Sequence, residues 1–172
     1  LINRAISSPN QPNLLLYGAI GNHSYSCFFD ILCKQYPSLK LQTIDYGSFT
    51  YKRFHWYYEF TFIEIQKKNR DIFWSHLLEI VSTPSTSGHK RMVIFKDTHK
   101  MMDHFQDKMR VVLEKYSWFN TFVVFSVNIT SLSDAFRSRF LNIRFPIKDK
   151  DHTVDVIPSD IICNDIMKMY DH

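Results

Sequence analysis

The segment from residue 14 to residue 25 contains residue types that could bind phosphate. A strand that leads into the pattern G-x-x-x-x-G-K-[ST] and then a helix holds phosphate through backbone N–H groups, while its Lys reaches the β- and γ-phosphates and its Ser/Thr holds Mg²⁺. Gly18 takes the first glycine position, and Gly21 and Asn22 lie inside the loop. The second glycine, the lysine and the hydroxyl residue are replaced by His23, Ser24 and Tyr25. The scaffold of a nucleotide site is therefore present without the groups that bind and activate a nucleotide.

The elements that would position this loop can be predicted from the apolar pattern. Five apolar runs, most of them continuously hydrophobic, are expected to be strands covered on both faces: Leu14 to Tyr17, Leu41 to Tyr46, Met92 to Phe95, Thr121 to Val127 and Phe140 to Phe145. Helical patterns lie between them, at 25–36, 69–81 and 103–116, and a short one follows Ser131 or Ser133 as its N-cap. Strands that alternate with helices predict an α/β fold with a doubly wound, mostly parallel sheet.

Length and composition indicate a folded globular chain. The 172 residues fit one domain, or one domain and the start of another. Hydrophobic residues make up 45% of the sequence and aromatic residues 16%, which argues against a disordered chain. The net charge of +4 permits contact with nucleic acid without demonstrating it. No run of about twenty apolar residues occurs, so no membrane span is expected.

The cysteines and the two ends of the chain give further expectations. Cys27, Cys33 and Cys163 lack C-x-x-C spacing, so we expect reduced thiols in an intracellular protein. Residues 1–6 have the pattern of the middle of a helix, and we expect the native chain to continue upstream. Residues 1–147 are expected to form the core, and 148–172 a polar linker and an amphipathic helix. That helix would begin a second, lid-like domain or, alternatively, pack back on the core.

The order of several motifs resembles the AAA+ core of a sliding-clamp loader small subunit of the replication factor C type. Residues 12–18 are similar to the family's P-x-L-L-x-Y-G entry to its Walker A loop, and 92–101 are similar to its Walker B strand, usually hhhh-D-E-A-D-x-L. Residues 113–116 match the family's M-E-K/E-Y at the end of the next helix. The resemblance implies a P-loop NTPase-like core with a five-stranded, mostly parallel sheet, helices on both faces and the start of a helical lid.

The later motifs extend the resemblance to residue 145. Residues 122–128 resemble the sensor 1 strand, which ends in Asn, here Asn128. Residues 136–140 resemble the I-R-S-R-C segment that carries a trans-acting arginine finger, here Arg139. Residues 55–60 faintly resemble the Y-H-L-E-h segment of the δ′-like, non-hydrolysing subunit. The family resemblance therefore implies a DNA-replication protein of the subclass that has lost its own ATPase.

The Walker B positions also depart from the family pattern. The Mg²⁺-binding Asp and the water-orienting Glu of an active member correspond to Lys96 and Asp97. At about 4 Å and an effective dielectric of about 20, each unit-charge interaction is on the order of 4 kcal/mol, so an ammonium in place of a carboxylate strongly disfavours the metal. Because phosphoryl transfer depends on such positioning and charge neutralisation, we expect no ATP hydrolysis, no metal and no cofactor. Alternatively, Lys96 replaces the loop lysine as a phosphate counter-charge, and ATP or ADP binds.

Arg139 is predicted to keep its function. In the resembled family this Arg crosses a subunit interface and neutralises the γ-phosphate held by the neighbour, and loss of a subunit's own ATPase does not remove that use. Alternatively, Arg139 is a solvated residue at a helix end. Arg137 is expected to form a structural salt bridge. The resemblance implies other AAA+ clamp-loader subunits in a hetero-oligomer, a sliding clamp and primer-template DNA as partners, and no membrane.

Other residues could contact DNA. In clamp loaders the helix that corresponds to 103–116 faces the central channel, and its basic residues follow the DNA backbone. Arg110 matches one such position, Val111 stands where a second Arg is common, and Lys108 could compensate. An ordinary exposed helix face is the alternative. Aromatic residues between 54 and 62 could stack on single-stranded bases, but core or interface packing is the preferred interpretation.

Two rival functions and a source follow from the same residues. The chain could be a structural protein that kept the AAA+ fold without replication activity, or an ATPase with a rearranged site.

The eight histidines show no metal-ligand spacing. The altered motifs and the Phe-, Tyr-, Ile- and Lys-rich composition are typical of a large DNA virus, which predicts a location in the nucleus or at a viral replication site in the cytoplasm.

Overall fold

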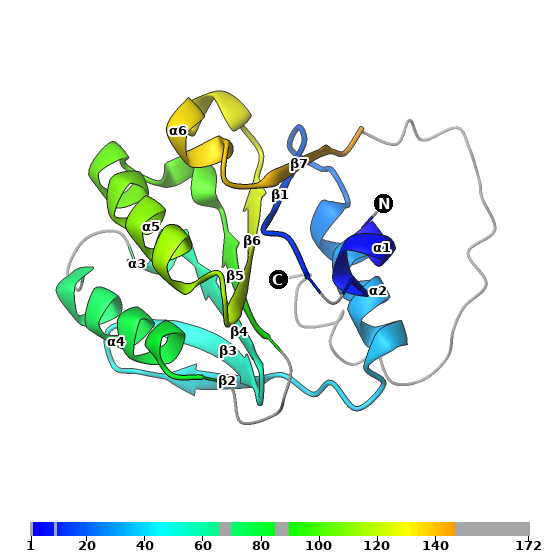
Figure 1. Ribbon diagram of the computed structural model, residues 1–172, viewed down its shortest axis with the longest axis horizontal. Helices are drawn as coiled ribbons and strands as arrows, with labels where there is room; N and C mark the ends of the chain where they lie inside the picture. The colour runs from blue at the N-terminus through cyan, green and yellow to red at the C-terminus, as the bar shows by residue number, and fades with distance from the viewer. Residues whose placement is uncertain (1, 9, 66–69, 85–89, 147–172) are drawn as a thin grey trace.

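The computed structural model describes residues 2–8, 10–65, 70–84 and 90–146, which form a sheet between two layers of helices (Figure 1). The sheet has seven strands in the order β2-β3-β4-β5-β6-β1-β7. Strands β4, β5, β6, β1 and β7 are parallel, and β3 and β2 extend the sheet antiparallel beyond β4. The strands are β1 (Leu14–Tyr17), β2 (Gln42–Asp45), β3 (Thr50–Phe54), β4 (Tyr57–Thr61), β5 (Arg91–Lys96), β6 (Asn120–Ser126) and β7 (Leu141–Arg144).

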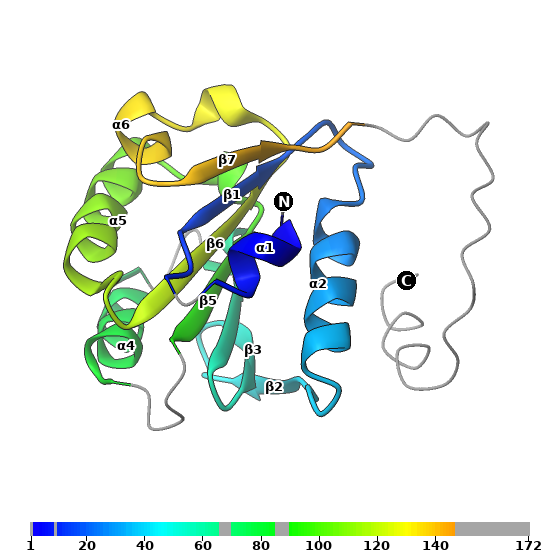
Figure 2. The ribbon, with the colours of Figure 1, turned by 45° about the vertical axis from the view of Figure 1, so that its right-hand side comes forward.

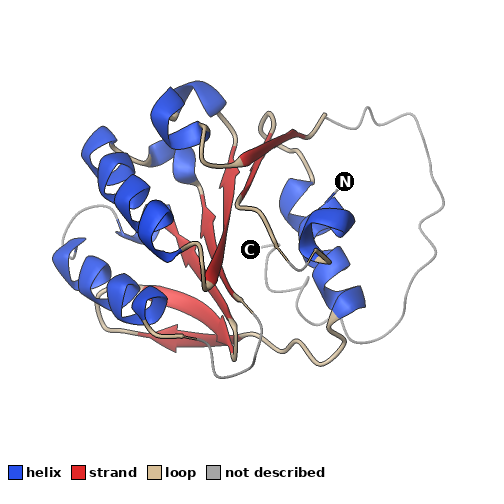
Figure 3. Ribbon diagram, viewed as in Figure 1, coloured by secondary structure: helices blue, strands red, loops and turns tan. Residues whose placement is uncertain are grey.

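Helices cover both faces of the sheet (Figures 1 and 2). One face packs against α1 (Ile2–Ile6) and α2 (Ser24–Gln35), and the opposite face packs against α4 (Arg70–Ser82) and α5 (Asp103–Tyr116). The short elements are α3 (Phe62–Ile65), α6 (Asp134–Arg137) and the 3₁₀ turns η1 (Thr98–Lys100) and η2 (Ile129–Ser131). Figure 3 distinguishes the strands of the sheet from the helices that cover it. The predicted α/β class with helices on both faces is confirmed.

The predicted boundaries agree with the structure to within a few residues. Helix α5 has the predicted bounds, and each of the five predicted strands is present. Ser133 caps α6, because its hydroxyl oxygen accepts a hydrogen bond from the N–H of Phe136 at 3.3 Å. The predicted linker at 148–152 and the helix that follows it lie outside the described residues.

The expected number of five strands is wrong, because the aromatic region forms β3 and β4. These two strands make a tight hairpin, in which Phe54 pairs with Tyr57. Four successive residues of β4, Tyr57 to Phe60, are buried, but Glu59 is polar, so β4 shows neither a continuous apolar run nor a regular polar alternation in the sequence. The preferred interpretation of the aromatic residues as core is confirmed for Tyr57 and Phe60.

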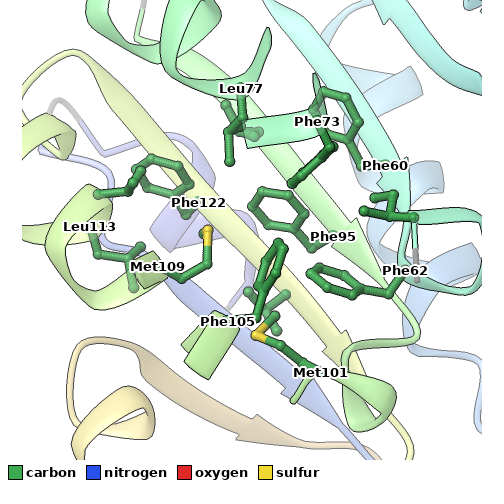
Figure 4. Close-up of a cluster of buried hydrophobic side chains, with 14 of the residues drawn as sticks. Phe60, Phe62, Phe73, Leu77, Phe95, Met101, Phe105, Met109, Leu113 and Phe122 are labelled. Carbon is green, nitrogen blue, oxygen red and sulfur yellow. The ribbon is translucent and has the colours of Figure 1, made fainter. Parts of the chain in front are cut away.

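The larger core lies between the sheet and helices α4 and α5 (Figure 4). The ring of Phe95 on β5 stacks on Phe60 of β4 at a centroid distance of 5.8 Å, and Phe62 meets Phe105 of α5 edge to face at 4.6 Å. Phe73 of α4 is fully buried and lies 5.4 Å from Phe60. Aromatic contacts of Phe95 with Phe60 of β4 and Phe62 of α3 thus fix β5, the strand that ends at Lys96.

Two buried polar side chains close the C-terminal ends of α4 and α5. The guanidinium of Arg91 donates to the carbonyl oxygens of Ile80 and Thr83, the latter at 2.8 Å. The amide of Asn120 donates to the carbonyl oxygens of Val81 at 2.9 Å and Tyr116 at 2.8 Å. Carbonyl groups at a helix end lack intrahelical partners, so these contacts satisfy groups that burial would otherwise penalise.

Stability is expected to fall as the pH drops from about 7 to about 5. The ring of His76 on α4 lies 4.2 Å from that of Tyr46, its side chain is 10% exposed, and burial lowers its pKa below 6.5 although Glu79 is 3.7 Å away. In this pH range the unfolded chain binds a proton that the folded chain resists, so the free energy of unfolding decreases. Urea unfolding at the two pH values should show a smaller decrease for His76→Phe.

Exposed His55 supplies the control for this measurement. His55→Gln should keep the pH dependence of the parent chain, whereas part of it remains in His76→Phe because burial also lowers the pKa of His99. Equal decreases in the parent and in His76→Phe would contradict the assignment to His76.

Candidate functional site

The altered motifs meet at the C-terminal ends of β1, β5 and β6. These neighbouring strands are parallel, so the loop after Tyr17, the residues at the end of β5 and those after Ser126 share one edge of the sheet. The N–H of Gly18 donates to the carbonyl oxygen of Ser126 at 3.2 Å, which joins the start of the loop to β6. The fold therefore brings the Walker A-like, Walker B-like and sensor 1-like segments to one edge of the sheet.

Asn22 fills the interior of the loop. Its side-chain amide donates to the carbonyl oxygens of Gly18 at 3.0 Å and Ala19 at 2.7 Å, and its side-chain oxygen accepts from the N–H of Ser24 at 2.9 Å. The N–H of Asn22 itself donates to Ala19 at 3.0 Å. A phosphate-binding loop turns such N–H groups towards its ligand, whereas here the N–H groups of Gly18, Asn22 and Ser24 are bonded within the chain.

Two glycines set the path of this loop. A Cβ atom at Gly18 would lie 2.4 Å from the carbonyl oxygen of Phe145, so a larger residue cannot fit between the loop and the residue after β7. Gly21 has a φ of +85°, a left-handed conformation that favours glycine. Ile20, between them, is 84% exposed. The glycines thus keep a tight turn, while the residues that would contact phosphate are gone.

A buried carboxylate lies beside Tyr25 and Lys96. Glu59 on β4 is 3% exposed, and its Oε2 atom accepts hydrogen bonds from the hydroxyls of Tyr25, at 2.7 Å, and Tyr57. Its Oε1 atom is 3.8 Å from Nζ of Lys96. The Lys96 ammonium also lies over the Tyr25 ring, 4.1 Å from its centroid. We call Tyr25, Tyr57, Glu59 and Lys96 the tyrosine–lysine cluster.

The electrostatics of this cluster favour neutral tyrosines beside a paired carboxylate. Burial raises the pKa of Tyr25 far above its ordinary value, and the charge of Glu59 raises it further. The same causes raise the pKa of Tyr57 well above 10. Both hydroxyls therefore keep their protons and donate to Glu59 at every physiological pH.

Tyr25 and Lys96 stand at the two sequence positions that hold Mg²⁺ in a working site. Tyr25 puts an aromatic ring at the Ser/Thr position, and Lys96 puts a positive charge at the Asp position. Of the described residues, no three His, Cys, Asp or Glu side chains are grouped in a way that could hold a metal ion. The residues present therefore do not fit a magnesium ion bound in the manner of this motif.

Asp97 and Asn128 have local roles beside the cluster. Asp97 precedes η1 with a φ of 56°, a left-handed conformation that aspartate and asparagine adopt more readily than other residues except glycine. Asn128 is exposed, and its side-chain oxygen accepts from the N–H of Thr130 at 3.0 Å and from its hydroxyl at 2.7 Å. The Asn128 side chain thus caps η2.

Arg139 lies just after α6 and folds back on α5. Its Nε donates to Glu114 Oε1 at 3.0 Å, Nη2 contacts the same oxygen, and Nη1 donates to the carbonyl oxygen of Ala135. The Arg139 side chain is 25% exposed and that of Glu114 is 57% exposed. The pair lowers the pKa of Glu114 below 4.5, since Arg139 stabilises the carboxylate. The predicted structural ion pair of Arg137 is also present, with Asp134.

The two predicted DNA contacts lie on opposite flanks of α5. Arg110 donates to Asp107 at 3.0 Å, and the Lys108 ammonium is 5.6 Å from the ring centroid of Trp74 on α4. Residues two positions apart on a helix do not share a face. The structure therefore does not combine Arg110 and Lys108 into one basic patch, although each remains a candidate for contact with DNA.

Glu59 and Gln106 are site residues that the motif analysis did not single out. Gln106 of α5 is 1% exposed, and its amide donates to the carbonyl oxygens of Met101 at 3.1 Å and Ser131 at 3.0 Å. Its side-chain oxygen accepts from the N–H of Ser133 at 2.8 Å. Gln106 thus connects the segment after β5 to α6. For Glu59, the available signal in the sequence was a glutamate between aromatic residues. For Gln106, the signal was a polar residue on the apolar face of the predicted helix.

Comparisons with known proteins found similar solved structures but no match to the sequence. No protein-family model matches the chain, and no curated protein matches it. The structure is similar to a DNA polymerase III gamma subunit-related protein from Thermotoga maritima, with a TM-score of 0.51 and 15% identity over 83% of this chain and 44% of that chain. It is also similar to a RuvB protein of Thermotoga maritima, with a TM-score of 0.48 and 12% identity over 83% of this chain and 40% of that chain.

The similarity concerns the fold of the core. The chain spans less than half the length of either of these proteins, and its sequence identity to them is low. Within the described residues, no helix has the length and apolar character needed to cross a membrane. The comparison with the gamma subunit-related protein, the strand order and the converging motifs together show that the chain has the fold of an AAA+-type P-loop core.

Proposed function

We propose that this chain is a non-catalytic AAA+ subunit of a clamp-loader-like assembly, in which it gives Arg139 to a nucleotide held by a neighbouring subunit. The observation that carries the proposal is the contrast between the loop after β1 and the surroundings of Arg139. Asn22 bonds within the loop after β1, and the tyrosine–lysine cluster takes up the Tyr25 and Lys96 positions, whereas Arg139 stays near the surface beside α6. Such a chain is suited to act on a partner's ATP without hydrolysing its own.

The absence of ATPase activity is inferred from charge. A phosphoryl-transfer site needs a metal ion and a lysine to neutralise the phosphates. Here Ser24 replaces the lysine, and Lys96 would repel a metal placed beside it. Lys96 is engaged by Glu59 and Tyr25, which argues against its use as a counter-charge for phosphate. ATP and ADP are therefore not expected to bind.

The surroundings of Arg139 are compatible with action in trans. Its partner, Glu114, is more than half exposed, and exposed ion pairs contribute little to stability. A phosphate group carries more negative charge than a carboxylate and can accept two parallel hydrogen bonds from a guanidinium. A neighbour's nucleotide can therefore displace Glu114 at small cost, which leaves Arg139 available as an arginine finger.

The proposed partners follow from this assignment. They are AAA+ clamp-loader subunits with intact phosphate loops, a ring-shaped sliding clamp and primer-template DNA. Arg110 and Lys108 are the proposed DNA contacts, and each would add sequence-independent, salt-sensitive affinity for the phosphate backbone. The viral source and the location at a replication site stay predictions from the sequence.

Native mass spectrometry of the endogenous complex tests the proposal. We expect a mixed AAA+ assembly that contains this chain, and isothermal titration of the isolated chain with Mg·ATP should give no binding heat. A lone chain or a homo-oligomer would instead support a structural protein that kept only the fold. ATP turnover by the isolated chain would support an ATPase with a rearranged site.

A further inference from the structure

We propose that the tyrosine–lysine cluster is a built-in substitute for bound metal and nucleotide, which holds the start of α2 on the sheet without any ligand. The inference rests on the proposed non-catalytic function and adds what replaced the lost ligand. In a working site, Mg²⁺ and phosphates join the residue at the Tyr25 position to the carboxylate at the Lys96 position. Here the side chains at these positions contact each other directly.

The first step concerns the buried charge. Glu59 is 3% exposed, and a carboxylate at that depth is tolerated only when it is paired and hydrogen-bonded. Two tyrosine hydroxyls donate to one of its oxygens, and the Lys96 ammonium is 3.8 Å from the other. Lys96 thus supplies the opposite charge beside the buried carboxyl group of Glu59.

The second step concerns the sheet, which places these groups on one face. Thr61 of β4 pairs with Lys96 of β5, and Glu59 lies two residues before Thr61. Side chains two positions apart on a strand point to the same side, so Glu59 and Lys96 are diagonal neighbours. This face is the one that packs against α2, where Tyr57 lies fully buried in the core.

The third step concerns the contacts that fix Tyr25, the second residue of α2. Its hydroxyl is held by Glu59, its ring face by the Lys96 ammonium, and its ring meets Phe125 of β6 edge to face at 5.4 Å. One side chain is therefore fixed from β4, β5 and β6. A ligand-binding protein gains such stability only when its ligand is present, whereas this chain contains the bridging groups itself.

The charges of Lys96 and Glu59 also support the proposal that the cluster replaces bound metal and nucleotide. A metal site joins its side chains through a cation, and the cation here is the Lys96 ammonium at the end of β5. The anion that faces it is Glu59 in place of a phosphate. The side chains of Lys96 and Glu59 thus supply the neighbouring positive and negative charges that a bound Mg·nucleotide would supply.

The experiment uses the full 172-residue chain and a double-mutant cycle between Lys96 and Glu59. Lys96→Met and Glu59→Gln are each expected to lower the thermal midpoint by several degrees, and the double variant should lose clearly less than the sum of the two. Lys40→Met, at an exposed position, is the matched control and should leave the midpoint unchanged. Tyr25→Phe removes one hydroxyl only, and serves in the cycle if Lys96→Met does not fold.

Hydrogen exchange and a ligand titration complete the test. Lys96→Met should speed amide exchange in the first turns of α2 more than in α5, and Mg·ATP should not raise the midpoint of the parent chain. The proposal for the cluster would be overturned if the losses in thermal midpoint were additive in the cycle, or if Lys96→Met had the same midpoint as Lys40→Met. Either result would leave the proposed function intact. A midpoint raised by Mg·ATP would overturn both.

Discussion

Replacement of Arg139 by alanine is expected to lower the ATPase rate at the neighbouring nucleotide by about 10³- to 10⁵-fold, the range that arginine fingers supply. The guanidinium would neutralise charge that develops on the transferred phosphate, and alanine leaves that charge uncompensated. The measurement is single-site ATP turnover in the purified complex, with the assembly checked by native mass spectrometry. Because Arg139 is partly exposed and its ion pair with Glu114 lies at the surface, the ring should stay assembled.

Two further variants test whether the effect comes from the guanidinium of Arg139 or from a change in local structure. Arg137→Ala removes a neighbouring arginine that pairs with Asp134 on its own helix, and should leave turnover nearly unchanged. Arg139→Lys keeps the charge without the planar fork, so we expect only partial recovery. Turnover that is the same with Arg139→Ala as with the parent chain would show that Arg139 is not the finger.

Arg139 and the loop after β1 are positioned by separate contacts. Arg139 is positioned by the capped turn at Ser133 and by Glu114 of α5, and neither contact involves the loop after β1. Gln106 holds the N-terminal side of α6 through the N–H of Ser133. Substitutions at Ser24, Tyr25 or Lys96 can therefore accumulate without moving Arg139.

Much of the fold was predictable from local pattern. Helix α5 was found with its bounds because its buried residues recur with helical spacing, and β1, β5 and β6 were found because they are continuous apolar runs. The hairpin of β3 and β4 was missed because polar residues interrupt its aromatic residues at irregular intervals, at Lys52, Arg53, His55 and Glu59. It therefore shows neither the continuous apolar run nor the regular alternation on which a strand prediction depends.

The site was predictable as a set of positions but not as a set of contacts. The motif order identified the loop at Gly18, the charge reversal at Lys96 and the arginine at 139. The pairing of Lys96 with Glu59 depends on the register of β4 against β5, which no local pattern contains. The pairing of Arg139 with Glu114 likewise joins α5 to the second residue after α6, 25 positions away in the sequence. Tertiary contacts of this kind require the folded chain.

Phe95→Ala is expected to lower the free energy of unfolding by about 3–5 kcal/mol, as deletions of buried aromatic rings do. Phe95 is fully buried, and its ring stacks on Phe60 and lies 6.0 Å from Phe62. A domain of this size is stable by about 5–15 kcal/mol, so the loss is a large share of the total. Urea unfolding measures the effect, and Phe95→Leu should recover part of it because leucine fills more of the space.

Phe95 and Lys96 are successive residues of one strand, so their side chains point to opposite faces of the sheet. Phe95→Ala should therefore speed hydrogen exchange throughout the sheet and in α4 and α5, while Lys96→Met acts first on α2. Val111→Ala, on the outer face of α5 and 61% exposed, should change stability by less than about 0.5 kcal/mol. If Phe95→Ala cost no more than Val111→Ala, the aromatic core could not be what fixes β5, and the position of Lys96 would need another cause.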